Sequence, residues 1–392
     1  MHFSRNMRES IYKSLNTYPV TAITGPRQCG KSTLAREIVK EIPENIYLDL
    51  ERPSDIKKLE NAEWFFSSQK NKLICIDEIQ RKPELFPLIR SLVDEWTRPG
   101  CFLVLGSASR ELLKQSSESL AGRITYKRLT PFLIDELPAD YSIEQYLNAG
   151  AFPRSILAPD PETSFQWRED FIAGFLERDL AQWAAISHAA IGRLWRMLAH
   201  LNGTTINYSM LSSSMNFSSV TIKNYIDLLA ATYMLETVPP YVSNLGKRLV
   251  KAPKIYIADS GICTALLGLR SFEEIAGHPA FGSLWEQTVL SHIIGWYPGA
   301  KVYYYRTSNG AETDFVIQLG RKIYAVECKA SYNPVLSKGN YLAFEDIDPE
   351  HTFIVIPPGK SIQSWPMKPK IDIVTLPDLK KVLENPKFKT ES

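Results

Sequence analysis

The chain has 392 residues, a length typical of roughly two or three domains, and a formal net charge of +2. Its hydrophobic content of 44% is enough to form folded cores. Five cysteines without a C-x-x-C pair argue against a disulfide framework or a structural zinc site and favour a reducing cytoplasm. The N-terminus is polar and no long apolar stretch is present, so we expect the protein to be neither secreted nor associated with a membrane.

A glycine-rich loop separates a predicted strand from a predicted helix near the start of the chain. Val20–Thr24 is a β-branched apolar run, and apolar residues at helical spacing extend from Ser32 to Ile42. The loop reads G-x-x-x-x-G-K-S, a pattern typical of phosphate binding. We expect Lys31 to contact the β- and γ-phosphates of ATP, and the Ser32 hydroxyl to bind Mg²⁺. The predicted nucleotide-binding residues are Gly25, Pro26, Arg27, Gln28, Cys29, Gly30, Lys31, Ser32 and Thr33.

A second apolar run ends in two carboxylates. Leu73–Ile76 reads as a parallel strand buried on both faces, and such strands carry ligand chemistry at their carboxyl ends. Asp77 follows it and is expected to hold Mg²⁺. Glu78 comes next and is expected to orient or deprotonate the attacking water, which favours a hydrolase over a small-molecule kinase.

Two further strands are predicted on either side of that run, at Ile46–Leu50 and Cys101–Ser107. A strand between the one that precedes the glycine-rich loop and the one that precedes Asp77 suits the ATPase branch that carries an additional catalytic glutamate. Ser107, or else Ser109, is a candidate sensor of the γ-phosphate, and an ordinary turn serine is the alternative. Arg123 is a candidate phosphate contact in the same chain or from a neighbouring subunit, and a surface loop arginine is the alternative.

The middle of the chain reads as helices followed by an extended pair. Tyr208–Met215 and Ser219–Tyr233 predict a helix, a tight turn and a second helix, after an apolar helix at Ile191–Leu201. Met234–Val238 and Lys254–Ala258 then predict a β-hairpin, which completes a winged helix-turn-helix. A helical spacer or a subunit contact is the alternative. The predicted DNA-binding residues are Lys223, Lys247, Arg248, Lys251 and Lys254.

The last segment contains a second set of carboxylates. A predicted strand ends with Glu327 and Lys329 on one face, and Asp314 opens the preceding strand. Glu286 lies on an amphipathic helix before both strands. We expect Glu286, Asp314 and Glu327 to bind Mg²⁺, and Lys329 to act as a catalytic residue that positions water or stabilises charge.

These stretches resemble known families. The helix followed by D…E-x-K resembles the PD-(D/E)xK nuclease superfamily. The whole chain resembles a prokaryotic AAA-type ATPase family labelled "ATP-binding protein", whose C-terminal domain of unknown function looks like that nuclease fold. The stretches that carry this resemblance are GPRQCGKSTL, LICIDEIQR, LVLGSASRELL, ESLAGRI, LERDL, KAPKIYIADSG, YYRTSNGAETDF and AVECKAS.

The resemblance implies an α/β chain of three parts. These are a P-loop NTPase domain with a parallel sheet (1–138), a helical winged-helix domain (139–260) and a restriction-endonuclease-like domain (261–392). It implies ATP binding and hydrolysis, a winged-helix module and a nuclease-like tail. We also expect Mg²⁺ as a cofactor, DNA as a partner and a cytoplasmic location, while the sequence leaves open whether the chain forms a homo-oligomer. Two functions remain open at this point. In one, nucleotide state controls DNA binding and metal-dependent DNA cleavage. In the other, the protein is a nucleotide-dependent switch with a catalytically silent nuclease-like domain.

Overall fold

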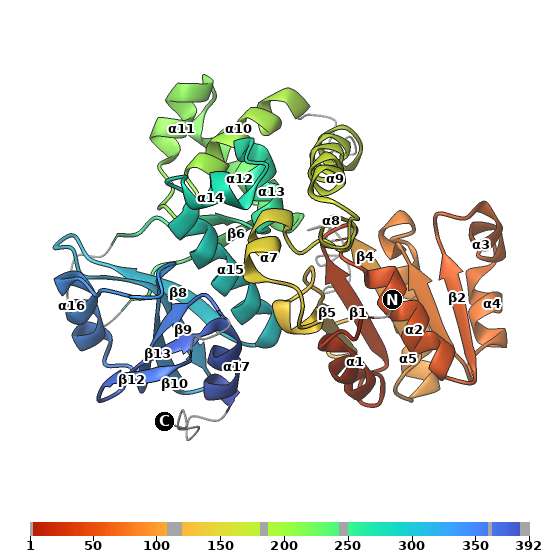
Figure 1. The fold of residues 1–392 in the computed structure, drawn as a ribbon. Coiled ribbons are helices and arrows are strands. Elements are labelled where there is room, and N and C mark those ends of the chain that lie inside the picture. The colour runs from red at the N-terminus through yellow and green to blue at the C-terminus, as the bar shows by residue number, and fades with distance from the viewer. Residues whose placement is uncertain (1–2, 108–119, 181–186, 243–249, 360–362, 385–392) are drawn as a thin grey trace. The chain divides into compact units, whose positions relative to one another are not determined.

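The computed structural model describes residues 3–107, 120–180, 187–242, 250–359 and 363–384. The chain forms two compact units. Figure 1 shows the chain coloured from red at the N-terminus to blue at the C-terminus. Unit 1 comprises Met1–Phe132 and the short segment Ala231–Tyr233, and unit 2 comprises Leu133–Ala230 and Met234–Ser392. The boundary predicted after residue 138 lies close to this division, whereas residues on both sides of the boundary predicted after residue 260 belong to unit 2.

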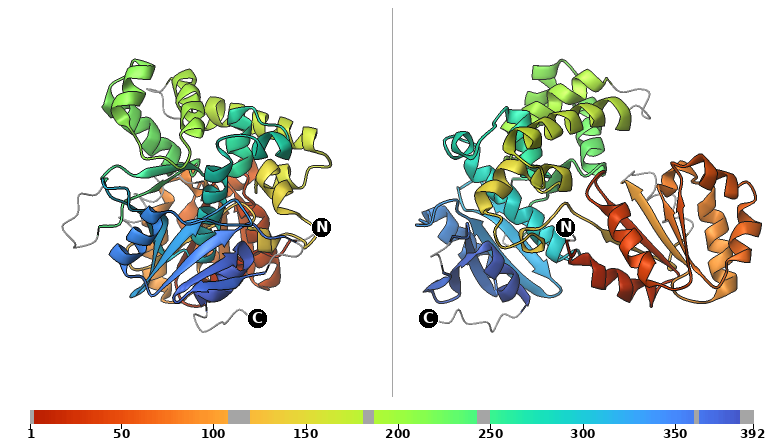
Figure 2. Two further views of the ribbon diagram at one scale, coloured as in Figure 1. Left: turned by 60° about the vertical axis from the view of Figure 1, so that its left-hand side comes forward. Right: turned by 45° about the vertical axis from the view of Figure 1, so that its right-hand side comes forward.

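Unit 1 is an α/β domain with helices on both faces of one sheet (Figures 1 and 2). Its strands are β1 (Val20–Gly25), β2 (Asn45–Asp49), β3 (Leu73–Asp77), β4 (Phe102–Ser107) and β5 (Ile124–Arg128). Its helices are α1 (Met7–Leu15), α2 (Lys31–Glu41), α3 (Pro53–Lys58), α4 (Ala62–Ser68), a 3₁₀ turn (Ile79–Arg81) and α5 (Leu85–Trp96). Helices α1 and α2 contact each other, as do α4 and α5.

All strand pairs in this sheet are parallel, in the order β2-β3-β4-β1-β5. Strand β4 therefore lies between β1, which leads into the glycine-rich loop, and β3, which ends at Asp77. Every residue of β1 and β3 is buried, as expected for strands covered by helices on both faces. The four strands predicted in this part of the chain are confirmed, and β5 was not predicted.

The first half of unit 2 is mainly helical. Its helices are a 3₁₀ turn (Ile134–Glu136), α7 (Ile143–Ala149), α8 (Pro153–Ile156), α9 (Pro161–Gly174) with a π-helical continuation (Phe175–Asp179), α10 (His188–His200), α11 (Tyr208–Met215) and α12 (Ser219–Ala231). Strands β6 (Leu235–Val238) and β7 (Lys254–Ile257) form a two-stranded antiparallel ribbon. The predicted sequence of three helices and a strand pair is therefore observed as α10, α11, α12, β6 and β7.

The second half of unit 2 contains a six-stranded mixed sheet. It begins with α13 (Ser260–Leu267), α14 (Phe272–Ala276) and α15 (Phe281–Trp296), and continues with β8 (Lys301–Arg306), β9 (Glu312–Leu319), β10 (Lys322–Cys328), α16 (Lys338–Ile347), β11 (His351–Ile356), β12 (Trp365–Lys368), β13 (Ile371–Thr375) and α17 (Leu376–Glu384). The strand order is β12-β13-β11-β10-β9-β8. Strands β8, β9 and β10 are antiparallel neighbours, whereas β10 pairs in parallel with β11. Among the described helices, none is both long and apolar enough to cross a lipid bilayer.

Candidate functional site

The glycine-rich loop of unit 1 joins the buried strand β1 to the start of α2. Gly25 has a φ of +149°, and a Cβ atom there would lie 2.2 Å from the carbonyl oxygen of Leu129, so the loop can leave the sheet here only with glycine. Gln28 and Gly30 also adopt positive φ, at 63° and 102°. Such turns direct backbone N–H groups toward one point, which suits an anion at the N-terminus of a helix.

Lys31 is buried at the first position of α2. Its ammonium group donates hydrogen bonds to the loop carbonyls of Gly25 (3.0 Å) and Pro26 (2.8 Å). The loop thus holds its own cation when no phosphate competes for it. Ser32 follows at the second position of α2 and is half-buried. The structure brings together every residue predicted for this loop, from Gly25 to Thr33.

Arg5 supports the loop from behind, a role that no sequence pattern indicated. Its guanidinium donates hydrogen bonds to the carbonyl oxygens of Cys29 (3.0 Å), Thr130 (2.5 Å) and Pro131 (3.2 Å), and its side chain is buried. The Cys29 thiol is also buried and lies 3.6 Å from the Leu129 carbonyl oxygen. Cys29 therefore contributes packing beneath the loop, and its own backbone carbonyl is the link to Arg5.

Asp77 ends β3 at the same edge of the sheet as the loop, because both β1 and β3 run toward that edge. Its carboxylate accepts hydrogen bonds from the Tyr47 hydroxyl (2.5 Å) and from the backbone N–H of Glu78 (3.0 Å). The Arg36 guanidinium lies over the Tyr47 ring at 4.9 Å. Burial raises the pKa of the Tyr47 hydroxyl, and its hydrogen bond to Asp77 adds to the shift, so Tyr47 acts as a donor here.

Glu78 adopts the left-handed backbone region, with a φ of 56°. For a residue with a Cβ this conformation is strained, and strain of this kind concentrates at functional sites. The Gln80 amide group donates hydrogen bonds to the Glu78 carboxylate and to the Ser107 hydroxyl (3.0 Å). Burial raises the pKa of Glu78 above its ordinary value, and the charge of Lys31 opposes that shift.

Ser107 therefore lies at the carboxyl end of β4, where the sequence predicted a polar residue. Ser109, the second candidate, lies outside the described residues. Arg123 is not brought to the phosphate loop of its own chain. It pairs with Asp94, with 2.9 Å between Nη2 and Oδ2. Arg123 directly precedes β5, and the first residue of β5 pairs with Val20, the first residue of β1. The glycine-rich loop follows the opposite end of β1. A contact between Arg123 and a neighbouring subunit stays a prediction.

Tyr233 lies in the short segment of unit 1 that follows α12 in the chain. Its hydroxyl donates a hydrogen bond to the Thr24 hydroxyl (3.2 Å), one residue before Gly25. The Arg128 guanidinium lies 4.4 Å from its ring centroid. No sequence pattern indicates this contact, because Tyr233 lies 209 positions after Thr24 in the chain.

Two of the carboxylates predicted in unit 2, Glu286 and Asp314, lie beside the ammonium group of Lys254, together with Glu312, which was not predicted. The Lys254 side chain, from β7, is 3% exposed. Its Nζ atom lies 3.3 Å from Asp314 Oδ1, 3.4 Å from Glu312 Oε1 and 3.8 Å from Glu286 Oε2. Burial alone lowers the pKa of Lys254, but the charges of these three carboxylates outweigh it and raise the pKa above its ordinary value. Lys254 is therefore charged.

Other protein donors contact several of the carboxylate oxygens of this group. Asp314 Oδ2 accepts a hydrogen bond from the backbone N–H of Cys328 (2.9 Å). Glu327 accepts from the Lys329 ammonium (2.8 Å) and the Thr313 hydroxyl (3.2 Å). The Tyr256 hydroxyl donates to Glu286 Oε2 (2.8 Å). Neither Lys254 nor Tyr256 was included in the predicted carboxylate site.

Three local features position this group. The Trp285 indole donates a hydrogen bond to the Val355 carbonyl (3.0 Å), which fixes α15 against the sheet and sets the direction of Glu286. The Asn202 side chain accepts from the backbone N–H of Ile257 (2.8 Å) and so holds β7. Gly203, with a φ of +77°, lets the chain pass α15, since a Cβ there would lie 2.9 Å from Ser283 Cβ.

Burial, together with neighbouring like charge, perturbs the pKa values of two of these carboxyl groups. Burial raises the pKa of Glu286, the charge of Asp314 adds to this shift, and Lys254 opposes it. Burial likewise raises the pKa of Glu327, with Asp314 adding and Lys329 opposing. These two carboxyl groups therefore hold protons more readily than an ordinary glutamate.

The predicted DNA-binding residues fall into three groups. Lys223 on α12 and Lys251 before β7 are exposed. Lys247 and Arg248 lie outside the described residues. Lys254 requires a correction, because its buried ammonium is committed to carboxylates of its own chain and is not available to a DNA phosphate.

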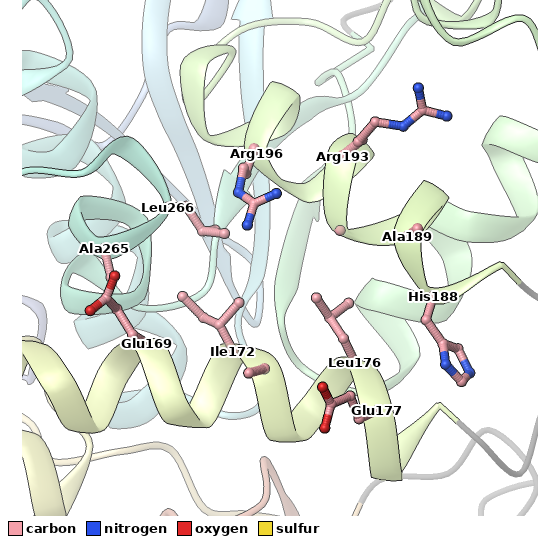
Figure 3. A pocket seen from close by; sticks show the side chains of 12 residues that line it. Glu169, Ile172, Leu176, Glu177, His188, Ala189, Arg193, Arg196, Ala265 and Leu266 are labelled. Carbon is pink, nitrogen blue, oxygen red and sulfur yellow. The ribbon is translucent and has the colours of Figure 1, made fainter.

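A hollow of about 600 Å³ lies elsewhere in unit 2, between α9, α10 and α13 (Figure 3). Ile172, Leu176 and Leu266 form its apolar part, and Figure 3 shows Arg196 above Ile172. None of the predicted site residues lines it. Its walls carry both Glu and Arg side chains, and the arrangement singles out no ligand chemistry.

Comparison with protein families divides the chain into three matched regions. Residues 17–137 match a family described as "AAA domain". Residues 140–273 and 281–379 match two families described as domains of unknown function, DUF8612 and DUF4143 respectively. The AAA match covers the sheet of unit 1 together with the loop, Asp77 and Glu78.

Two mycobacterial proteins are similar along most of the chain. They are "Uncharacterized protein Rv2008c" of Mycobacterium tuberculosis and "Uncharacterized protein Mb2031c" of Mycobacterium bovis, each 36% identical over 354 residues. The match covers 90% of this chain and 80% of each relative. A solved Walker-type ATPase of Pyrococcus abyssi, PABY2304, is 16% identical, and the match covers 68% of this chain and 96% of that chain with a TM-score of 0.49. That likeness is too weak to carry an argument.

Proposed function

Because this chain belongs to the same family as the two mycobacterial relatives and matches the AAA domain over residues 17–137, we propose that unit 1 binds ATP with Mg²⁺ and hydrolyses it. The observation that carries the proposal is the shared sheet edge. The loop cation, the Asp77 carboxylate and the strained Glu78 all lie there, at the carboxyl ends of parallel strands. A chance glycine turn would not account for the two acidic residues at the same edge.

Lys31 binds the β- and γ-phosphate oxygens in this proposal. To do so, its ammonium group exchanges the carbonyl oxygens of Gly25 and Pro26 for phosphate oxygens. The neighbouring backbone N–H groups and the N-terminus of α2 face the same charge. Arg5 keeps the loop in shape through the Cys29 carbonyl during this exchange.

The residues present suit Mg²⁺, a hard cation that prefers oxygen ligands. The Ser32 hydroxyl and the Asp77 carboxylate supply such oxygens, and Tyr47 orients the carboxylate. When bound, Mg²⁺ neutralises the charge that develops on the β- and γ-phosphates.

Glu78 accepts the proton of the attacking water. Its raised pKa, caused by burial, makes the carboxylate a stronger base than an exposed glutamate. Gln80 holds the carboxylate and also contacts Ser107, so one amide connects the base to the tip of β4. This connection supports Ser107 as the residue that responds to the γ-phosphate.

A second part of the proposal concerns unit 2, where nucleotide state controls the binding of DNA. The order of α10, α11, α12 and the β6–β7 ribbon supports a winged-helix arrangement, and the exposed Lys223 and Lys251 support phosphate contacts. The contact of Tyr233 with Thr24 supports coupling, because this segment joins α12 to β6 and ends beside the loop. Cleavage of DNA by Glu286, Asp314, Glu327 and Lys329 is the competing version, and cutting of plasmid DNA in Mg²⁺ or Mn²⁺ would distinguish the two.

Nucleotide binding tests the assignment of the loop. Titration of a fluorescent ATP analogue should give saturable binding to the wild-type protein and little to Lys31→Ala. Lys40→Ala is the matched control, since Lys40 is an exposed lysine of the same helix. Equal affinity of a folded Lys31→Ala protein and of Lys40→Ala would remove Lys31 from the phosphate site.

A further inference from the structure

The carboxylates of unit 2 carry an inference that does not depend on ATP hydrolysis. Their sequence pattern predicts a divalent metal held by Glu286, Asp314 and Glu327. Mg²⁺ requires near-octahedral oxygen ligands at about 2.1 Å and needs carboxylate oxygens free to bind it. The fit of this site to a metal can be judged from what each oxygen already contacts.

Both oxygens of Asp314 are committed to protein donors. One lies 3.3 Å from the Lys254 ammonium, and the other accepts the backbone N–H of Cys328 at 2.9 Å. Glu327 is committed in the same way, to Lys329 and Thr313. Within the described part of the chain, no group of three or more His, Cys, Asp or Glu side chains is suited to hold a metal ion.

The charges around the carboxylates also disfavour a metal ion at this site. Lys254 Nζ lies within 4 Å of three carboxylates from two different elements, α15 and β9. Lys329 and Arg306 pair with Glu327 and Glu312, so the negative charge of the group is largely compensated. A doubly charged ion would meet the ammonium of Lys254 directly, with little water to screen the repulsion.

We propose that Lys254 is the resident cation of this carboxylate group and excludes divalent metals from it. The ammonium bridges Asp314, Glu286 and Glu312, and so joins the β6–β7 ribbon to the six-stranded sheet. An ammonium carries one charge and offers no coordination position for water, so it does not supply the activated water that phosphodiester hydrolysis requires. The group is an internal ion-pair network and not a metallonuclease centre.

The backbone around Lys254 supports a fixed position. Lys254 begins β7, where it pairs with Val238 of β6 and also bridges to Thr205. The backbone N–H of Ile255 donates to the Thr204 carbonyl (3.0 Å), and the Asn202 side chain holds the far end of β7. Withdrawal of the ammonium therefore requires movement of the whole ribbon.

Binding of Mn²⁺ to the nucleotide-free protein tests the proposal, with electron paramagnetic resonance as the readout of bound metal. The proteins compared are wild type, Asp314→Asn, Lys254→Met, and Lys254→Met combined with Asp314→Asn. Lys301→Met is the matched control, since Lys301 is an exposed lysine of the same unit. Methionine keeps the length of the side chain and removes its charge.

We expect wild type, Asp314→Asn and Lys301→Met to bind the same amount of Mn²⁺ at millimolar metal. Lys254→Met should bind one additional ion, and Asp314→Asn should abolish that gain. Wild-type binding that Asp314→Asn removes would overturn the proposal, as would a folded Lys254→Met protein without an additional ion. If Lys254→Met does not fold, the comparison of wild type with Asp314→Asn still decides, because the proposal requires equal binding.

Discussion

Tyr47 donates a hydrogen bond to Asp77 from the neighbouring strand, with 2.5 Å between its hydroxyl oxygen and Oδ2. Asp77 is the carboxylate expected to hold Mg²⁺, so Tyr47 determines which way a metal ligand points. The Arg36 guanidinium stacks over the Tyr47 ring and fixes it from α2. In the proposed nucleotide site, the orientation of Asp77 thus depends on residues of β2 and α2 that lie outside the glycine-rich motif.

Tyr47→Phe should therefore weaken the site without unfolding the domain. Loss of a residue that orients a metal ligand typically costs 10- to 100-fold in metal affinity or activity, and we expect about 10-fold here because Glu78 N–H still holds Asp77. The measurement is the Mg²⁺ concentration for half-maximal ATP hydrolysis. Tyr18→Phe, at an exposed tyrosine, is the control. An unchanged Mg²⁺ requirement in Tyr47→Phe would contradict the role of Tyr47.

Binding of DNA should depend on the exposed lysines of unit 2. The double variant Lys223→Ala with Lys251→Ala should flatten the plot of log affinity against log salt by close to one unit for each lost phosphate contact. Lys40→Ala with Lys70→Ala removes the same charge from exposed positions in unit 1 and should leave the slope unchanged. Fluorescence anisotropy at several salt concentrations measures both. Equal slopes in the two double variants would favour a spacer or protein-contact role for the α10–β7 segment.

Stability should fall in mild acid because of His292. This side chain is fully buried on α15, and its Nε2 atom accepts the backbone N–H of Ile134 at 2.9 Å. Its Nδ1–H therefore donates to the Thr288 carbonyl at 2.7 Å, which fixes the neutral ring. Burial lowers the pKa of His292 to about 4. Above the ordinary histidine pKa of about 6.5 the ring is neutral in both the folded and unfolded states and contributes no pH dependence.

Between about pH 6.5 and pH 4 the unfolded chain binds the proton and the folded chain does not, so the free energy of unfolding falls by about 1.4 kcal/mol per pH unit. Urea unfolding at pH 7.5 and 5.5 should reveal this loss. His292→Gln removes the ionisable ring, so its free energy of unfolding should fall less between pH 7.5 and 5.5 than that of wild type. His200→Gln, at an exposed histidine, should show the same decrease as wild type. An identical loss in wild type and His292→Gln would assign the pH dependence to other groups.

Much of unit 1 could be predicted from the sequence. The run before Gly25 and the run before Asp77 are continuous and apolar, because both strands are buried on two faces, and the loop between strand and helix has a fixed spacing. These local signals predicted β1, α2 and β3 together with Lys31, Asp77 and Glu78. Tyr47 and Arg5 left no such signal, since their roles arise only when β2 and the N-terminal segment fold against the loop.

The carboxylate group of unit 2 illustrates the opposite case. Strand alternation placed Glu327 and Lys329 on one face, and the two side chains pair in the structure. Asp314 from the adjacent strand and Glu286 from α15 were expected near the same point. Lys254 was predicted to contact DNA phosphates because it clusters with Lys247, Arg248 and Lys251 in the predicted wing. Its burial depends on contacts with residues 32 to 60 positions away, which charge patterning along the chain does not reveal.

If unit 1 hydrolyses ATP with Glu78 as the base, the Glu78→Gln variant should lose most of its steady-state phosphate release. The amide keeps the shape of the side chain and removes the base, so turnover should fall by about 10²–10⁴-fold while ATP affinity stays near that of wild type. Glu84→Gln, an exposed position in the same domain, should hydrolyse ATP like wild type. Wild-type turnover in Glu78→Gln, or an equal loss of binding and turnover, would show that Glu78 is not the base.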